Sequence, residues 1–153
     1  MVLARLWAPQ SVPISNEWER GYCPICGSRP LLAFLQEDGK REVVCSACET
    51  IWAVPRLFCL NCENRDQKTM GYFFVETHEG ARLDVCSLCR HYIKTLDLRK
   101  KGSSLIPVLE DLLTTHLDLW AQKKGYKKLP LLGSLMEEKK AHEDPLQGLA
   151  GKG

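Results

Sequence analysis

Short apolar runs separated by turn residues make up most of the chain between residues 31 and 93. The run 31–35 (LLAFL) predicts a strand, and the Asp-Gly step at 38–39 predicts a tight hairpin turn, because glycine accepts a positive φ. Residues 41–44 predict the return strand, and 51–54 (IWAV) predict one more. This part of the sequence therefore indicates a hairpin followed by a third strand.

The same organisation is predicted a second time further along the chain. Residues 72–75 (YFFV) predict an outgoing strand and 79–80 (EG) a turn, and a return strand and the short apolar run 92–93 (YI) follow. The segment 78–89 (HEGARLDVCSLC) matches 37–48 (EDGKREVVCSAC) at six of twelve positions. The identical pairs are Gly39/Gly80, Arg41/Arg82, Val44/Val85, Cys45/Cys86, Ser46/Ser87 and Cys48/Cys89. The chain thus contains one structural unit twice.

A different pattern begins after residue 103, where apolar residues recur at steps of three and four. Pro107 lies near the start of this run, and Lys123, Lys124 and Gly125 lie at its end, as expected of a helix. We expect its apolar stripe to pack on the neighbouring strands, with a groove or helix of a partner as the alternative. The stripe consists of Leu105, Leu109, Leu112, His116, Leu119 and Trp120. From residue 137 onward the polar, aperiodic sequence predicts disorder.

Cysteine is the unusual feature of the composition. The chain has eight cysteines, all in C-x-x-C pairs: Cys23/Cys26, Cys45/Cys48, Cys59/Cys62 and Cys86/Cys89. An even number could form disulfides in a secreted protein, but the first residues lack the apolar block of a secretory signal. The uniform spacing is typical of metal ligands. A dithiol oxidoreductase would place a pair at a helix N-terminus, and none of the four pairs opens a predicted helix.

Four thiolates at about 2.3 Å from one ion form a tetrahedral site. The four pairs can be matched sequentially, nested or crossed, and the repeat favours sequential matching because each copy then holds a complete site. The gap between pairs is 18 residues in the first copy and 23 in the second, against about 15–20 in typical sites. Hairpins this small bury little apolar surface, so we expect metal binding to supply their folding energy.

One residue after each pair bears on the geometry of the site. Gly27 follows the first pair, where a positive φ lets backbone N–H groups point at the sulfurs. Glu49, Glu63 and Arg90 occupy the equivalent positions. These three residues must either adopt the strained backbone or leave the sulfurs solvated in another way.

The remaining composition argues against several functions. Eight thiolates and two divalent ions would change the formal charge from +2 to −2, and two ferric ions would bring it to zero, so nucleic-acid binding is not indicated. No run approaches the roughly 20 apolar residues of a membrane span. We find no Ser/His/Asp arrangement or glycine-rich phosphate loop and predict no enzymatic activity. The histidines at 78, 91, 116 and 142 are surplus to the ligands, although His91 could donate a hydrogen bond to a thiolate.

Four linked blocks of sequence resemble one known family. They are CPICGSRP at 23–30, CSACETIWAVPRLFCLNCEN at 45–64, CSLCRHYIKTLD at 86–97 and EDLLTTHLDLWAQKKGY at 110–126. Together they resemble the formate dehydrogenase accessory proteins of the FdhE type over residues 17–126. The resemblance marks the eight cysteines as metal ligands. It also places Trp52, Arg56, Tyr92, Lys94, Asp111 and Asp118 on family motif positions without assigning their roles.

The resemblance implies a cytoplasmic, non-enzymatic maturation factor that binds the molybdenum- or tungsten-containing catalytic subunit of formate dehydrogenase. It also implies two rubredoxin-like lobes that hold metal, often iron. Members usually carry a long, mainly helical N-terminal region, whereas 22 residues precede Cys23 here.

We therefore expect a small, metal-stabilised mixed α+β fold with two ions, iron or zinc. Two tandem rubredoxin-like or zinc-ribbon lobes would be followed by an amphipathic helix. The expected parts are an N-terminal extension at 1–22, four-cysteine lobes at 23–54 and 55–103, the helix at 104–126 and a flexible tail at 127–153. A zinc-ribbon nucleic-acid-binding module and a rubredoxin-like electron-transfer protein are the alternative functions.

Overall fold

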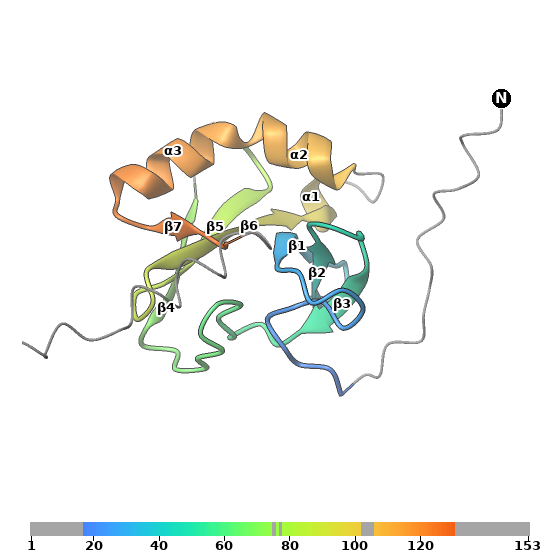
Figure 1. The fold of residues 1–153 in the computed structure, drawn as a ribbon. Coiled ribbons are helices and arrows are strands. Elements are labelled where there is room, and N and C mark those ends of the chain that lie inside the picture. The colour runs from blue at the N-terminus through green and yellow to red at the C-terminus, as the bar shows by residue number, and fades with distance from the viewer. Residues whose placement is uncertain (1–16, 75, 77, 102–105, 131–153) are drawn as a thin grey trace, which may run out of the picture.

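One mixed sheet forms the centre of the molecule in the computed structural model (Figure 1). The structure describes residues 17–130 apart from 75, 77 and 102–105. The predictions for Leu105, His142 and residues 131–153 of the tail lie outside the described residues, whereas Lys127 and Lys128, at the start of the predicted tail, form a strand and Leu129 is buried. The strands are β1 (Pro30–Leu35), β2 (Arg41–Cys45), β3 (Ile51–Val54), β4 (Met70–Phe74), β5 (Ala81–Cys86), β6 (His91–Asp97) and β7 (Lys127–Lys128). The helices are α1 (Leu98–Lys101), α2 (Pro107–Leu113) and α3 (Thr115–Lys123).

The sheet consists of two three-stranded halves joined side by side. Its order is β3-β2-β1-β6-β5-β4, and β7 pairs with β6. The two predicted hairpins are confirmed, with Gly39 and Gly80 at their turns at φ +82° and +83°, and the third strand of each half also pairs antiparallel. The halves meet where β1 and β6 pair in parallel, with Ala33 opposite Thr95 and Leu35 opposite Asp97. The sequence did not indicate this junction.

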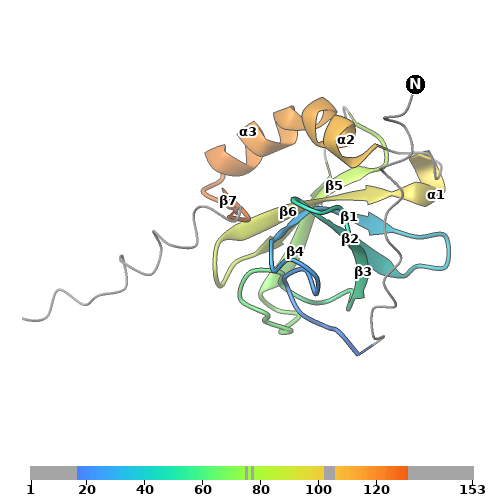
Figure 2. The same cartoon turned by 45° about the vertical axis from the view of Figure 1, so that its right-hand side comes forward.

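Each face of the sheet has its own hydrophobic core. Helices α2 and α3 cover one face (Figure 2), where Leu32, Leu83 and Leu96 pack with Leu117 and Ala121 of α3. The loops that carry the cysteines cover the other face, where they pack on a second group of buried residues. That group includes Ala33, Val43, Trp52, Phe58, Leu60 and Ile93. No helix in the described part of the chain is long and apolar enough to span a bilayer.

The structure corrects the predicted packing of the C-terminal helix. Two helices replace one, because the buried Thr114 between them donates its hydroxyl to the Glu110 carbonyl oxygen at 2.6 Å. The predicted stripe is not the buried side: Leu109, Leu112 and Leu119 are all exposed. The residues that face the sheet are instead Glu110, Thr114, Leu117, Asp118 and Ala121.

A buried ionic network explains this orientation. The Nζ of Lys94, on β6, lies 2.6 Å from Asp111 and 2.7 Å from Asp118, and the Tyr92 hydroxyl donates to Asp118 at 2.7 Å. Burial, and then the bond to Asp118, raise the pKa of Tyr92. The helices therefore turn two acidic residues inward, because the buried ammonium of Lys94 must be paired.

Candidate metal centres

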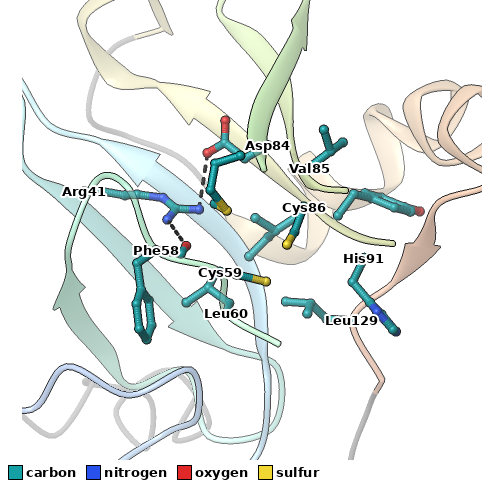
Figure 3. Close-up of a pocket in the computed structure, with 12 residues that line it drawn as sticks. Arg41, Phe58, Cys59, Leu60, Asp84, Val85, Cys86, His91 and Leu129 are labelled. Carbon is teal, nitrogen blue, oxygen red and sulfur yellow. Dashed lines mark hydrogen bonds and ion pairs between the residues drawn. The ribbon is translucent and has the colours of Figure 1, made fainter. Parts of the chain in front are cut away.

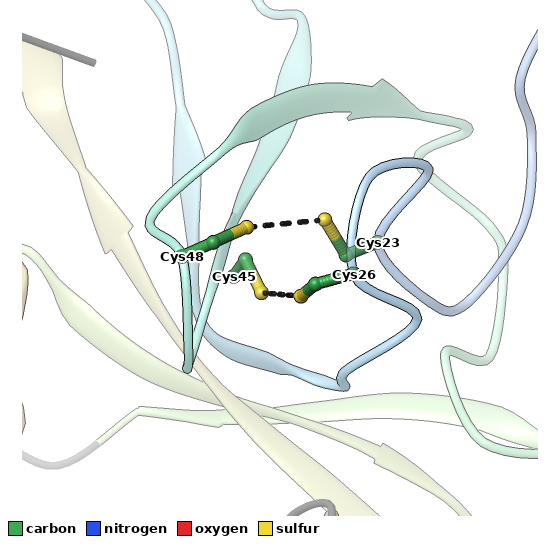
Figure 4. Close-up of side chains that lie close together, drawn as sticks. All are labelled: Cys23, Cys26, Cys45 and Cys48. Atoms are coloured by element: carbon green, nitrogen blue, oxygen red, sulfur yellow. Dashed lines mark hydrogen bonds between the residues drawn. The ribbon is translucent and has the colours of Figure 1, made fainter. Parts of the chain in front are cut away.

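The first cluster consists of Cys23, Cys26, Cys45 and Cys48, whose sulfurs point toward one another (Figure 4). The loop before β1 carries the first pair, and the end of β2 with the turn after it carries the second. The sulfurs of Cys23 and Cys48 lie 3.5 Å apart, and those of Cys26 and Cys45 lie 3.4 Å apart. The hairpin β1–β2 thus brings the two pairs together.

The second cluster consists of Cys59, Cys62, Cys86 and Cys89. The sulfurs of Cys59 and Cys89 lie 3.5 Å apart, and those of Cys62 and Cys86 lie 3.8 Å apart. Each half of the sheet thus holds one complete cluster, which confirms the sequential matching predicted from the repeat.

The four sulfurs of each cluster fit a tetrahedral metal site. All ligand atoms within a cluster lie within 4.8 Å of one another. A tetrahedron with bonds of about 2.3 Å has edges of roughly 3.8 Å, close to the observed separations. A disulfide requires about 2.05 Å between sulfurs. The donor set of four sulfurs suits zinc or iron.

All four C-x-x-C turns, here called knuckles, use a left-handed residue directly after the second cysteine. Gly27 has φ +75°, and Glu49, Glu63 and Arg90 have φ values of +59°, +57° and +60°. The last three are the non-glycine residues with positive φ in the described part of the chain. The sequence left two alternatives at these positions, and the strained backbone is the one adopted. Such strain at an L-residue is typical of functional sites.

Burial follows one rule in both clusters. The first cysteine of every pair is buried, whereas Cys26, Cys48 and Cys62 are exposed and Cys89 is half-buried. Burial raises the pKa of Cys45 to about 12 and also raises that of Cys59. Burial opposes ionisation of Cys26 as well, but the neighbouring Ser28, followed by the sulfurs of Cys45 and Cys48, outweighs it and lowers this pKa to about 6. Binding a cation at the inner thiols would therefore release protons.

The repeated serine makes equivalent contacts in both halves. Ser46 donates its backbone N–H and its hydroxyl to the Arg29 carbonyl oxygen, at 3.1 and 2.7 Å. Ser87 donates the same two groups to the Thr69 carbonyl oxygen, at 2.8 and 3.1 Å. In each cluster, the repeated serine therefore fixes the second knuckle to the residue directly before the strand that follows the first knuckle.

The two clusters are also connected to each other. Arg29, which follows the first knuckle, donates to the carbonyl oxygen of Leu60 inside the third at 2.8 Å. Glu63 in turn accepts a bond from the Gly21 N–H at 3.2 Å. A Cβ on Gly21 would lie 2.1 Å from the Leu60 oxygen, so only glycine allows this close approach. The loops that hold the two clusters therefore interlock.

A buried arginine adds a third connection (Figure 3). Arg41 extends from β2 toward the second cluster, donates to the Phe58 carbonyl oxygen at 3.0 Å and pairs with Asp84 at 3.2 Å. These residues, with Cys59 and Cys86, line a cavity of about 20 Å³, roughly the space of one water molecule.

The other predicted residues have structural contacts. His91 Nδ1 lies 2.8 Å from the Cys89 carbonyl oxygen and 3.2 Å from Asn61 Nδ2, so its observed bonds do not include the predicted one to a thiolate. His78 and His116 lie beside each other, and neither belongs to a cysteine cluster. The buried Trp52 donates to the Arg20 carbonyl oxygen, and Arg56 is exposed. The sequence analysis did not single out Ser28 or Asp84. An acidic residue between the apolar residues of the strand that ends at Cys86 could have indicated that Asp84 is buried.

Two closed four-sulfur clusters on a small mixed sheet define a compact α+β domain of the metal-binding kind. The family descriptions "FdhE, central domain" and "FdhE, C-terminal domain" match residues 22–56 and 57–132. The chain belongs to the FdhE family.

Individual relatives agree with this assignment. An FdhE homolog of Aquifex aeolicus is 39% identical over 118 residues, which are 74% of this chain and 41% of the relative. A homolog of Haemophilus influenzae is 30% identical over 130 residues, which are 80% of this chain and 42% of the relative. The crystal structure of the FdhE protein from Pseudomonas aeruginosa has a TM-score of 0.66 at 26% identity, over 72% of this chain and 39% of that one. The chain thus spans about two fifths of these proteins' length.

Proposed function

We propose that this chain is a non-enzymatic, cytoplasmic accessory factor that binds the catalytic subunit of formate dehydrogenase and supports its assembly or activity. Each four-cysteine cluster would hold one ion, iron or zinc, with all eight cysteines as ligands. The halves at 23–54 and 55–103 would act as two rubredoxin-like lobes. They would lie between an N-terminal extension at 1–22 and the helical segment 104–126, with a tail at 127–153.

The closed donor sets are the observation that carries this proposal. Four protein sulfurs surround each candidate site, so a tetrahedral ion has no open position for substrate or water. A catalytic zinc site keeps such a position open. The clusters therefore favour a structural or electron-transfer role over hydrolysis, and membership of the FdhE family supports formate dehydrogenase as the partner.

The exposed outer sulfurs favour one second candidate function, electron transfer. Cys26, Cys48 and Cys62 lie at the surface, so an iron ion bound to them would lie close to a redox partner. Iron tetrathiolate can change oxidation state, whereas zinc cannot. Protein purified without oxygen should show the red colour of a ferric tetrathiolate after oxidation if iron is bound. Zinc alone would exclude electron transfer and leave the structural role.

Binding and metal analysis on one preparation would test the proposal. The catalytic subunit should co-purify with wild-type protein that carries two ions per chain. The variants Cys26→Ser/Cys48→Ser and Cys62→Ser/Cys89→Ser should lose metal and binding together, because the clusters hold the knuckles in place. Metal-loaded wild-type protein that fails to bind the subunit would refute the accessory role. Salt-dependent binding to DNA or RNA would instead favour the nucleic-acid alternative.

A further inference from the structure

The register of the two hairpins identifies equivalent strand positions. Leu35 lies opposite Arg41, and Phe74 lies opposite Arg82, the repeat equivalent of Arg41. Strand β4 is therefore the counterpart of β1. The equivalent pairs are Ala33 and Tyr72, Phe34 and Phe73, and Leu35 and Phe74.

Equivalent residues differ greatly in exposure. Ala33, Phe34 and Leu35 pair with β6 and are 0%, 6% and 2% exposed. Their counterparts Tyr72, Phe73 and Phe74 are 59%, 36% and 68% exposed, because β4 ends the sheet in the described part of the chain. Among the described residues, the second half of the sheet thus leaves open a strand position that is filled in the first half.

The backbone of β4 is also oriented for pairing. Two backbone hydrogen bonds show which residues of each hairpin bond across to the other strand. Gln36 donates its N–H to the Lys40 carbonyl oxygen in the first hairpin, and Ser87 donates its N–H to the Thr69 carbonyl oxygen in the second. Bonding residues alternate along an antiparallel pair. Ala33 and Leu35 therefore direct their N–H groups toward β6, and Tyr72 and Phe74 direct theirs outward. An edge of this kind is a template for another strand.

We propose that the free edge of β4 binds an extended apolar segment of the client polypeptide, which runs parallel to β4 as β6 runs parallel to β1. This inference rests on the proposed function for the identity of the client. Backbone hydrogen bonds would provide affinity, and side chains on alternate faces would provide selectivity.

Aromatic rings on both faces of β4 argue for an apolar segment. The rings of Tyr72 and Phe74 meet edge to face at 5.2 Å, and Phe73 lies on the opposite face, 4.8 Å from Trp120. Side chains of an added strand would meet this aromatic surface on either side. No charged residue or proline interrupts β4, although both are common protection against strand addition.

A second copy of this chain cannot fill the position in the same way. The counterpart of β6 in the first half is β3. Arg41 lies opposite Val54 and its equivalent Arg82 lies opposite Thr95, so the next residue, Pro55, occupies the position of Leu96. Proline has no N–H to contribute to a ladder. The free edge of β3 is thus blunted at the residue that would extend it, whereas β4 is left open. This asymmetry favours a different polypeptide as the occupant.

Two substitutions of one residue test the role of the edge. Tyr72→Pro removes the outward N–H and keeps the bonds to β5, whereas Tyr72→Thr removes the same ring and keeps the N–H. Affinity for the catalytic subunit should fall at least about tenfold further in the proline variant than in the threonine variant. Phe74→Lys, which places a charge on the edge, should weaken binding similarly. Metal content and thermal unfolding show whether each variant is folded. If Tyr72→Pro does not fold, binding by Phe74→Lys tests the role of the edge instead.

Amide hydrogen exchange provides an independent readout. The Tyr72 and Phe74 amides should exchange rapidly in the free protein and become protected when the subunit binds. Equal binding by wild type, Tyr72→Pro and Phe74→Lys would overturn the inference and leave the proposed function intact. Protection of these amides in the free protein would also overturn it, because the edge would already be covered. If the subunit does not bind wild-type protein, the proposed function fails. Strand addition at the edge is then tested separately with a peptide that has the sequence of β6, HYIKTLD: protection of these two amides by the peptide would support it, and no protection would overturn it.

Discussion

Arg41 of β2 and Asp84 of β5 form an ion pair at 3.2 Å, although β1 and β6 lie between their strands. Both side chains are buried. Burial lowers the pKa of Arg41, and the charge of Asp84 counteracts this effect. Asp84 also accepts a bond from Thr95 at 2.7 Å and pairs with Arg82 at 2.8 Å. Both arginines of the sequence repeat thus meet on one carboxylate, which belongs to one copy alone.

Removal of the carboxylate should be more harmful than removal of the pair. Asp84→Leu leaves the buried Arg41 without its counter-charge and should lower the free energy of unfolding by about 3–5 kcal/mol. The double variant Arg41→Met/Asp84→Leu should recover part of this loss, because the fully buried guanidinium is removed and only the less buried Arg82 loses its ion pair. Chemical denaturation of both metal-loaded variants measures the difference. A double variant less stable than Asp84→Leu would show that Arg41 contributes mainly through other contacts, such as its bond to Phe58.

Loss of one metal site should weaken the other. Cys62→Ser/Cys89→Ser should reduce the metal content to at most one ion per chain. The remaining ion should also be lost more readily to a chelator, because Glu63 and Leu60 of the second cluster hold Gly21 and Arg29 of the first. Chelator competition on wild type and variant measures this coupling. Unchanged affinity of the first cluster would show that the two halves bind metal independently.

Glycine should be tolerated, and even favoured, at a strained knuckle residue. Glu49 has φ +59°, a conformation that costs an L-residue roughly 1 kcal/mol or more. Glu49→Gly should therefore stabilise the protein by up to about 1 kcal/mol, reduced by the greater freedom of glycine in the unfolded chain. Glu49→Ala is the matched control, because it removes the same carboxylate and keeps the strain. Thermal unfolding compares them, and equal midpoints would argue against backbone strain at this position.

The buried network beneath the helices should make stability depend on acidic pH. Burial opposes ionisation of Asp111, but bonds from Lys94 and Lys128 outweigh it and hold the pKa of Asp111 below its ordinary value. Asp111 therefore binds a proton more readily in the unfolded chain than in the folded protein. The stabilisation from its charge is complete above the pKa of Asp111 in the unfolded chain and is lost as the pH falls through its lower pKa in the folded protein. The difference in unfolding free energy between wild type and Asp111→Asn should shrink over this range.

The comparison with Asp111→Asn also controls for acid release of metal. Both proteins carry the same eight thiols, so proton competition at the clusters affects them alike. A difference that stays constant with pH would mean that Asp111 contributes through packing and not through its charge.

The sequence by itself determined the local units and the grouping of their cysteines. Six repeated residues predicted two hairpins with one cysteine cluster each, and the structure groups the cysteines in that way. Such prediction succeeds because a C-x-x-C turn and an Asp-Gly or Glu-Gly hairpin are fixed by interactions over a few residues. The sequence left two alternatives at Glu49, Glu63 and Arg90, and the structure shows that all three adopt a positive φ.

Only the tertiary structure decided how these units combine. The parallel pairing of β1 with β6 joins residues far apart in the sequence, and no local pattern encodes such a partner. The inward face of α2 and α3 was mispredicted for the same reason. Apolar periodicity assigns charged residues to solvent, whereas Asp111 and Asp118 turn inward to Lys94 from another element. A buried charge is stable only beside its counter-charge, and the fold alone brings the two together.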